Sequence, residues 1–268
     1  MVWHKTIGSG PTKVVVIHGW FWDHRVFTPI FDCLDANRYT YAFIDIRGYG
    51  NSRTVSGGYT IGEVAGDAIA LAEKLGWHEF HVVGHSMGGK AAQKVAMDAG
   101  ARVRSVVAVT PVPASALPFD DAVFGFFAAA CEQDEVALTL MGDSIGNRAS
   151  KTWLKLMLRR ARDTASPEAF KSYMRSFIRD DFAADANKVK APMLVLYGEF
   201  VASARILCAA SILGSIRTQK SKRSEIPGTI RCRRRRSILQ PALRPLFLGL
   251  HKCTDRRAAR STAQATAV

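Results

Sequence analysis

The sequence predicts an α/β protein with a mainly parallel, doubly wound sheet. Strand-like apolar runs alternate with helix-like segments through residue 110, and this alternation is typical of βαβ units. The runs are almost unbroken by polar residues, as in parallel strands that are covered on both faces. A helical block at 112–190 then interrupts the alternation before a last apolar run. It indicates a helical cap inserted between two strands, and the C-terminal part of the fold is expected to be incomplete.

The expected strands are short segments rich in β-branched or aromatic residues that end at glycines or polar residues. They lie within 13–20, 39–50, 79–86, 103–110 and 192–198. The N-terminal segment "MVWHKTIGSGPTK" has no apolar stretch of the secretory type. No run approaches the roughly 18 apolar residues of a membrane span. We therefore expect a cytoplasmic protein without a membrane segment.

The segments between the strands predict helices. Thr60 and Glu63 have the spacing of a capping box and precede apolar residues that share one helical face, and Gly76 suits the end of that helix. Further helices are expected at 26–36 and 87–100, and in the cap near 121–130, 132–141, 149–162 and 167–179, the last beginning at Ser166-Pro167-Glu168.

The positive charge is concentrated near the C-terminus. The whole chain has a net charge of +14, but residues 200–268 alone contain 15 Lys and Arg and only two acidic residues. After Phe200 this segment has one aromatic residue, Phe247, no sustained helical or strand period, and an arginine run at 233–236. Such a composition is typical of a poorly ordered tail. We therefore expect a folded domain at 1–199, including the cap at 112–190, followed by an atypical basic tail at 200–268.

The segment "GHSMGG" at 84–89 places Ser86 between an apolar strand and an Ala-rich helix. A strand-to-helix turn of the form Gly-x-Ser-x-Gly strains its central residue and lifts the serine hydroxyl above the sheet. The helix N-terminus and the Met87 N–H would favour negative charge there. The alternative is that Ser86 only caps the helix.

A second strand ends in His18-Gly19-Trp20, where the Trp20 N–H could be another oxyanion donor. With "HGW" at 18–20, "DIRGYGNS" at 45–52, "GHSMGG" at 84–89 and the cap after the next strand, the chain resembles the α/β-hydrolase superfamily over residues 12–199. It is similar to the serine esterase, lactonase and cofactor-free haloperoxidase branches. Ser86 differs from the carboxylate nucleophile of the epoxide hydrolase and haloalkane dehalogenase branches.

The remaining histidines and charged residues near these motifs are expected to be structural. His18, which precedes the oxyanion loop, is expected to be a structural or pocket residue, and the His85 side chain is expected to be directed away from Ser86 in a packing role. Asp45 and Arg47 are expected to hold their loop by hydrogen bonds. The residues Trp20, Phe21 and Trp22 either line an acyl pocket or belong to the core, and His24, His78 and His81 are expected on the surface or in strands.

The resemblance implies an acid and a base that this sequence does not place where the family has them. The family's aspartate would follow the strand "LVLYG", but Val201 stands there, and Glu199 lies two residues earlier. After the elbow the chain has one histidine, His251, in a basic context without a preceding Gly-His pattern. Glu199 and His251 are the substitute candidates for acid and base, and Asp120 and Asp121 are another conceivable acid site. Since charge, periodicity and family pattern all change near residue 200, we hypothesise a frame-shifted or otherwise replaced C-terminus.

Two functions follow from these observations. The first is a carboxylesterase-like serine hydrolase that forms an acyl-enzyme on Ser86 with a small ester, lactone or related acyl substrate, and is impaired by the missing Asp and His. It requires no cofactor and no metal. The alternative is a non-catalytic protein of this fold whose basic tail binds nucleic acid or acidic surfaces; the tail lacks the aromatic residues that stack on bases, so we do not expect a nucleic-acid partner. The sequence leaves the oligomeric state open.

Overall fold

The structure is a computed structural model, and it describes residues 1–196. In chain order its elements are β1 (His4–Ile7), β2 (Thr12–Ile17), the 3-10 helix η1 (His24–Cys33), β3 (Tyr39–Ile44), η2 (Gly50–Ser52), α1 (Ile61–Lys74), β4 (Phe80–His85), α2 (Met87–Ala99), η3 (Gly100–Arg102), β5 (Val103–Val109), α3 (Asp121–Glu132), α4 (Asp134–Ser144), α5 (Lys151–Thr164), α6 (Pro167–Arg179), η4 (Ala183–Lys188) and β6 (Met193–Leu196). The predictions for Glu199, Val201, His251 and the tail at 200–268 concern residues outside this range and remain predictions.

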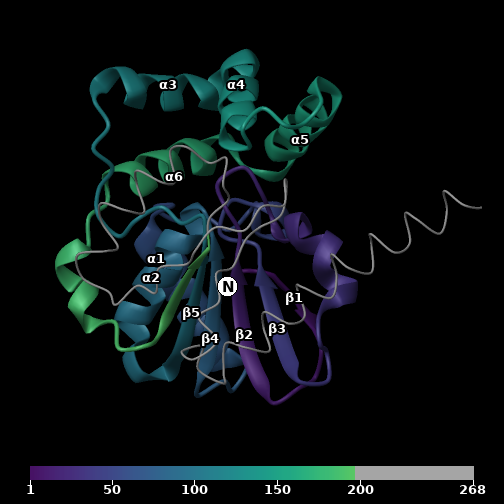
Figure 1. The fold of residues 1–268 in the computed structure, drawn as a ribbon, viewed down its shortest axis with the longest axis vertical. Helices are drawn as coiled ribbons and strands as arrows, with labels where there is room; N and C mark the ends of the chain where they lie inside the picture. Colours follow the sequence, from purple (N-terminus) through teal and green to yellow (C-terminus); the bar gives the residue numbers. More distant parts are fainter. Residues whose placement is uncertain (197–268) are drawn as a thin grey trace, which may run out of the picture.

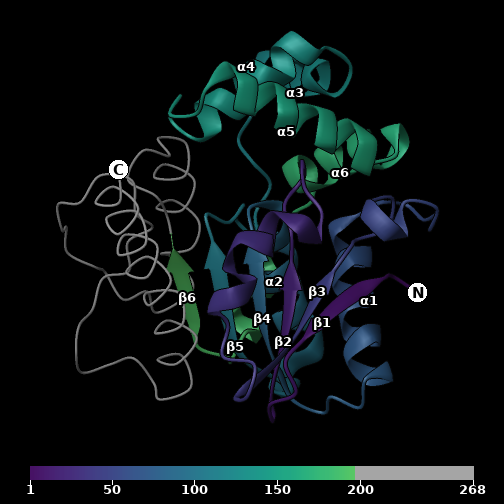
Figure 2. The same ribbon diagram turned by 90° about the vertical axis from the view of Figure 1, so that its right-hand side faces the viewer.

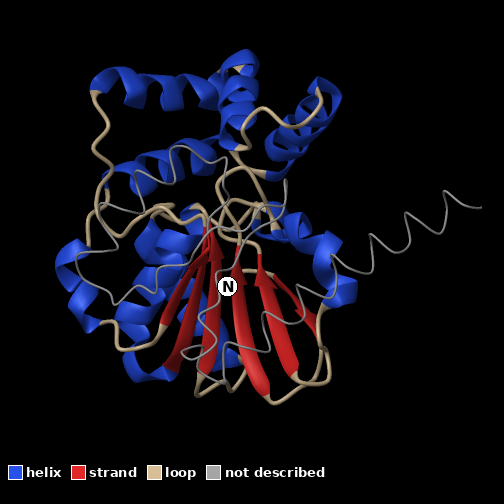
Figure 3. Cartoon of the chain, viewed as in Figure 1, coloured by secondary structure: helices blue, strands red, loops and turns tan. Residues whose placement is uncertain are grey.

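The strands form one sheet in the order β1-β3-β2-β4-β5-β6. β1 is antiparallel to β3, and every other neighbouring pair is parallel. Figure 3 shows the strands fanning out beneath a layer of helices. The predicted fold class, an α/β protein with a mainly parallel sheet, is confirmed. β1 was not predicted, and the helix expected at 26–36 is the 3-10 helix η1, which begins at His24.

Helices cover both faces of the central strands (Figure 2). Val15 and Ile17 of β2 belong to the main core, which includes the apolar faces of α1 and α2. Val14 and Val16 point to the other face and belong to a second cluster, against which Phe27 and Phe31 of η1 pack. Successive strand residues thus enter opposite cores, which explains why the apolar run of β2 has no polar alternation.

Helix α1 begins and ends as its sequence predicts. The Thr60 side chain accepts the Glu63 N–H while the Glu63 carboxylate accepts the Thr60 N–H, which is a reciprocal capping box. At the other end, the N–H groups of Gly76 and Trp77 donate to the carbonyls of Glu73 and Ala72. This pairing is a Schellman motif, and Gly76 provides the positive φ of 69° that it requires.

The helices α3 to α6 lie between β5 and β6 in the sequence and above the carboxyl ends of the strands in space (Figures 1 and 2). They correspond to the four amphipathic pieces expected in the insertion. Ser166 caps α6 by accepting the Ala169 N–H, and Pro167 occupies the first helical position as predicted. In the described part of the chain, no helix has the length and apolar character that crossing a membrane demands.

Candidate active site

Strand β4 ends at His85 and helix α2 begins at Met87, so the whole turn between them is Ser86. Its backbone has φ 55° and ψ −119°, a conformation that non-glycine residues adopt only when the surrounding structure enforces it. The Ser86 N–H donates to the Val109 carbonyl, and the Ser86 carbonyl accepts the Val112 N–H. These bonds fix the turn to the end of β5.

The glycines on either side of Ser86 allow this turn because backbone passes close to both. A Cβ on Gly84 would lie 2.1 Å from the Gly88 carbonyl oxygen, and a Cβ on Gly88 would lie 2.4 Å from the His18 carbonyl oxygen. Gly19 meets the turn from the other side, since a Cβ there would lie 3.2 Å from the Ser86 Cβ. The Gly-x-Ser-x-Gly spacing therefore reflects three backbone segments in contact around one serine.

The Ser86 side chain makes no capping hydrogen bond to α2. An N-cap serine would have its oxygen bonded to an N–H of the first helical turn. The alternative in which Ser86 only caps the helix is therefore wrong, and the hydroxyl is left for another partner.

Substituting glycine for Ser86 is expected to raise the free energy of unfolding by about 1 kcal/mol, because glycine relieves the positive-φ strain. Ser86→Ala is the matched control, since alanine removes the same hydroxyl but keeps the Cβ. Thermal denaturation of the two variants compares them directly. A Ser86→Gly variant that melts no higher than Ser86→Ala would show that the turn is unstrained.

The two expected oxyanion donors lie at the termini of elements that meet at Ser86. Met87 is the first residue of α2, where an N–H has no intrahelical acceptor. Trp20 follows Gly19, the residue whose backbone contacts Ser86. Among the described residues, no hydrogen-bond acceptor engages the N–H of either Met87 or Trp20. With respect to residues 1–196, both N–H groups are therefore available to an anion.

The Trp20 side chain serves the cap instead. Its indole N–H donates to the Phe170 carbonyl at 2.7 Å, and its ring stacks on that of Phe170 with a centroid distance of 4.5 Å. Phe21 also packs against Phe170, and both Trp20 and Phe21 are buried. Of the two roles left open for these aromatic residues, the structure favours core packing for Trp20 and Phe21, between the loop after β2 and helix α6.

His18 is buried with both ring nitrogens occupied. Its Nδ1–H donates to the Gly19 carbonyl at 2.8 Å, and its Nε2 accepts the Ile46 N–H at 3.2 Å. Burial lowers the pKa of His18, which keeps the ring neutral at pH 7. A ring committed to two backbone groups cannot also accept a proton from Ser86, so the structural role expected for His18 is confirmed.

His85 lies directly before Ser86, and its ring nitrogen Nδ1 is buried against Gly19 without a hydrogen-bond partner among the described residues. Burial lowers the pKa of His85 to about 4, so the ring is neutral at physiological pH. The described residues provide no carboxylate bonded to this ring. Within this part of the chain, His85 therefore has no orienting acid of the kind that a catalytic imidazole needs.

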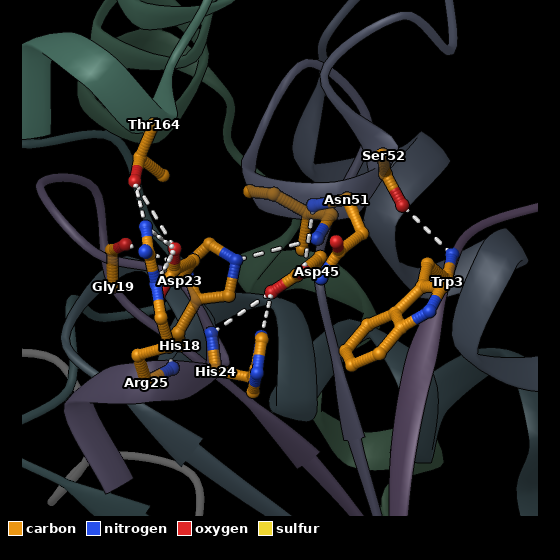
Figure 4. A network of polar contacts seen from close by, with 11 residues as sticks. Trp3, His18, Gly19, Asp23, His24, Arg25, Asp45, Asn51, Ser52 and Thr164 are labelled. Atoms are coloured by element: carbon orange, nitrogen blue, oxygen red, sulfur yellow. Dashed lines mark hydrogen bonds and ion pairs between the residues drawn. The ribbon is translucent and has the colours of Figure 1, made fainter. Parts of the chain in front are cut away.

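Asp45 is fully buried and holds its loop by four hydrogen bonds (Figure 4). One carboxylate oxygen accepts the backbone N–H and the Nδ1–H of His24, at 2.9 and 2.8 Å. The other accepts the backbone N–H and the side-chain amide of Asn51, at 2.9 and 3.0 Å. The loop-holding role expected for Asp45 is confirmed. The expectation that His24 lies on the surface or in a strand is wrong: it is buried at the start of η1 because Asp45 binds it there.

Asp23, His24 and Asp45 are the described residues whose potential metal-ligand atoms all lie within 4.8 Å of one another. Asp23 accepts hydrogen bonds from the Arg25 backbone and guanidinium and from the Thr164 hydroxyl at the end of α5. Each carboxylate oxygen of Asp23 and Asp45 thus already accepts a hydrogen bond. Asp23, His24 and Asp45 therefore form a hydrogen-bond network. This network ties the loop after β2 to the end of β3 and to Thr164 in the cap.

The other charged candidates are structural where they are described. Asp120 caps helix α3 by accepting the Val123 N–H at 2.8 Å, and Asp121 is exposed in the first turn of that helix. Arg47 forms a bidentate ion pair with Asp67 of α1, which agrees with the loop-holding role expected for it. Glu199 and His251 lie outside the described residues. Within residues 1–196 the structure therefore brings together Ser86, Met87 and Trp20, but no acid and base.

The comparisons with known proteins place this geometry in a family. A family model described as alpha/beta hydrolase fold matches residues 12–198. The acetyltransferase component of the acetoin cleaving system of Cupriavidus necator is 39% identical over 39% of this chain and 28% of that protein. The fluoroacetate dehalogenase of a Burkholderia species is 32% identical over 40% of this chain and 36% of that protein. The pimeloyl-[acyl-carrier protein] methyl ester esterase of Nitrosomonas europaea is 24% identical over 72% of this chain and 79% of that protein.

The chain spans half or less of the length of the first curated relatives that it matches. Among solved structures, a bromoperoxidase from Bacillus anthracis is 25% identical with a TM-score of 0.66, over 74% of this chain and 77% of that one. An esterase from Exiguobacterium antarcticum is 21% identical with a TM-score of 0.68, over 81% and 84%. The second likeness concerns the fold alone.

Proposed function

This chain belongs to the alpha/beta hydrolase fold family, and from that membership we propose that it is a serine hydrolase of the carboxylesterase type. Its substrate would be a small ester, lactone or related acyl compound. The observation that carries the proposal is the Ser86 hydroxyl, held at φ 55° on the N-terminus of α2 without a capping bond. Backbone strain of this kind persists where a side chain must be presented to a ligand.

In the proposed reaction the Ser86 oxygen attacks the acyl carbonyl carbon, and the carbonyl oxygen becomes an oxyanion. The N–H groups of Met87 and Trp20 stabilise that oxyanion, helped by the positive N-terminal end of α2. The alcohol leaves, the acyl group remains on Ser86, and water then releases the acid. The names of the matching esterases support an ester as the bond that is cleaved.

The proton of Ser86 must pass to a base during the attack. Of the described histidines nearest to the turn, His18 is committed to two backbone groups, and His85 has no carboxylate bonded to its ring within residues 1–196. Glu199 and His251 remain the proposed acid and base. Without a working pair, binding and oxyanion stabilisation alone leave about 10³-fold acceleration over water. Since Glu199 and His251 do not stand at the positions of the family's acid and base, we propose an enzyme of low activity.

A fluorophosphonate probe tests the proposal, because it reacts with an activated serine. We expect the probe to label the full-length protein at Ser86, as found by mass spectrometry of the modified peptide. Labelling should disappear in Ser86→Ala. It should persist in Ser56→Ala, a control that removes an exposed serine between η2 and α1. No adduct on Ser86 of the native chain would reject the serine hydrolase.

A further inference from the structure

Lys90 is a lysine without exposed surface, located one helical turn after the nucleophile candidate. It lies in the first turn of α2, and its own N–H bonds to the Ser86 carbonyl. Lysine side chains are rarely buried completely, because the ammonium loses its hydration. Desolvation lowers the pKa of Lys90 to about 8 despite the nearby carboxylates of Asp180 and Asp181. A buried cation this close to the site requires a specific set of partners.

All three ammonium donors of Lys90 have a carbonyl acceptor. Nζ lies 3.0 Å from the Ser115 oxygen, 3.0 Å from the Phe177 oxygen and 2.6 Å from the Asp180 oxygen. Phe177 and Asp180 lie at the C-terminal end of α6, where carbonyls lack intrahelical donors and the helix dipole favours a cation. The Phe182 ring lies 5.4 Å from the same Nζ.

These acceptors come from the two ends of the helical insertion. Ser115 belongs to the segment that leads from β5 into α3, whereas Phe177 and Asp180 belong to the segment that leaves α6. The two segments are also bonded to each other, by Leu117 N–H to the Ile178 carbonyl at 2.8 Å and by Phe182 N–H to the Ala114 carbonyl at 3.1 Å. We call these paired segments, residues 114–117 and 177–182, the neck of the insertion.

We propose that Lys90 is a positioning residue: its ammonium fastens both sides of the neck to the helix that carries Ser86, and thereby fixes the cap over the nucleophile. No side chain of the neck provides this link, because the acceptors are backbone carbonyls. The link depends on the cation at the end of a straight chain of the right length. The part of the inference that concerns the nucleophile rests on the proposed function; the attachment of the neck does not.

The substitution Lys90→Met tests the attachment, because methionine keeps an unbranched side chain of similar length and removes every donor. Hydrogen exchange of the full-length protein, followed by mass spectrometry, gives the readout. We expect amides of α3 to α5 to exchange at least about tenfold faster, equivalent to about 1.4 kcal/mol, while the sheet amides of β2, β4 and β5 keep their protection. Lys94→Met is the matched control: it lies on the same helix, but its lysine forms a partly exposed pair with Asp98. It should change neither region.

Two outcomes would overturn the proposal: unchanged exchange in α3 to α5, or an equal loss of protection in cap and sheet, which would mean a general loss of stability. If Lys90→Met does not give folded protein, Lys90→Gln retains two donors without the charge and must show the same selective effect in milder form.

Fluorophosphonate labelling separates the two proposals. With a small probe, Lys90→Met should label Ser86 within about twofold of the native rate, and with a bulky probe that must enter beneath the cap the rate should change about tenfold. Absence of labelling in the native chain would reject the serine hydrolase and leave the exchange result intact.

Discussion

The substitution Gly88→Ala is expected to destabilise the fold by about 3 kcal/mol or more. The new Cβ would lie 2.4 Å from the His18 carbonyl oxygen and 2.5 Å from the Ile17 carbonyl oxygen. Both atoms belong to the backbone at the end of β2, which is held between β3 and β4 and cannot move away without breaking the sheet. The clash would also separate the Gly19 backbone from Ser86. The change in the midpoint of urea denaturation measures the effect.

Gly66→Ala is the control for this prediction. Gly66 lies inside α1, and a Cβ there would have no neighbour within 4 Å. Alanine in an open helix interior stabilises by about 0.5–1 kcal/mol relative to glycine. The two Gly→Ala changes should therefore shift the midpoint in opposite directions. Equal shifts would mean that the close approach around Gly88 does not exist.

The substitution Asp45→Ala is expected to cost about 3–5 kcal/mol at pH 7, because it leaves the buried donors of His24 and the part-buried donors of Asn51 without their acceptor. The matched control is Asp98→Ala, which removes a partly exposed carboxylate paired with Lys94 and should cost less than about 0.5 kcal/mol. Chemical denaturation of both variants measures the difference. An Asp45→Ala variant as stable as the control would refute the role of the network.

The stability difference between the native protein and Asp45→Ala is expected to depend on pH. Burial alone would raise the pKa of Asp45, but the hydrogen bonds from His24 and Asn51 outweigh it and hold the pKa below its ordinary value of 3.8. The ionised form is therefore favoured in the folded state. Its contribution is complete above pH 3.8 and is lost as the pH falls through the lower folded pKa. The gap in unfolding free energy between native protein and Asp45→Ala should stay constant from pH 7 to 5 and narrow below pH 4.

The sequence predicted those parts of the fold whose causes are local. The capping box at Thr60 and Glu63 is formed within one helical turn, and the elbow depends on glycines close to Ser86. Each of the five expected strands is present, because an apolar run between turn residues has few other stable environments in an α/β sheet. Local patterns were therefore sufficient for five of the six described strands, for the elbow and for the helices of the cap.

Features that depend on distant partners were missed. The strand β1 has four residues and no apolar alternation, and it exists because His4 to Ile7 pair with β3 about 40 residues later. His24 is buried because Asp45 accepts its hydrogen bonds across 21 positions. Lys90 is an ordinary lysine in the sequence, and its acceptors lie up to 90 residues away. One signal was present: the small residues Gly88, Gly89, Ala91 and Ala92 around Lys90 indicate a helix surrounded by protein.

The candidate site was predicted in part for the same reason. Ser86, Met87 and Trp20 belong to short motifs at strand ends, and parallel strands bring their carboxyl ends together. An acid and a base come from segments far away in the sequence, and their positions depend on the whole fold. Glu199 and His251 therefore remain predictions from the family pattern.

The paired neck has a consequence for how this protein can diversify. Since hydrogen bonds join residues 114 and 117 to 182 and 178, the chain enters and leaves the cap at nearly one point. The segment between them behaves as a closed loop, whose entropy penalty rises by only about 0.6 kcal/mol for each doubling of its length. Helices can thus be inserted, deleted or transplanted beyond this junction with little effect on the sheet, so that the cap can evolve separately from the scaffold.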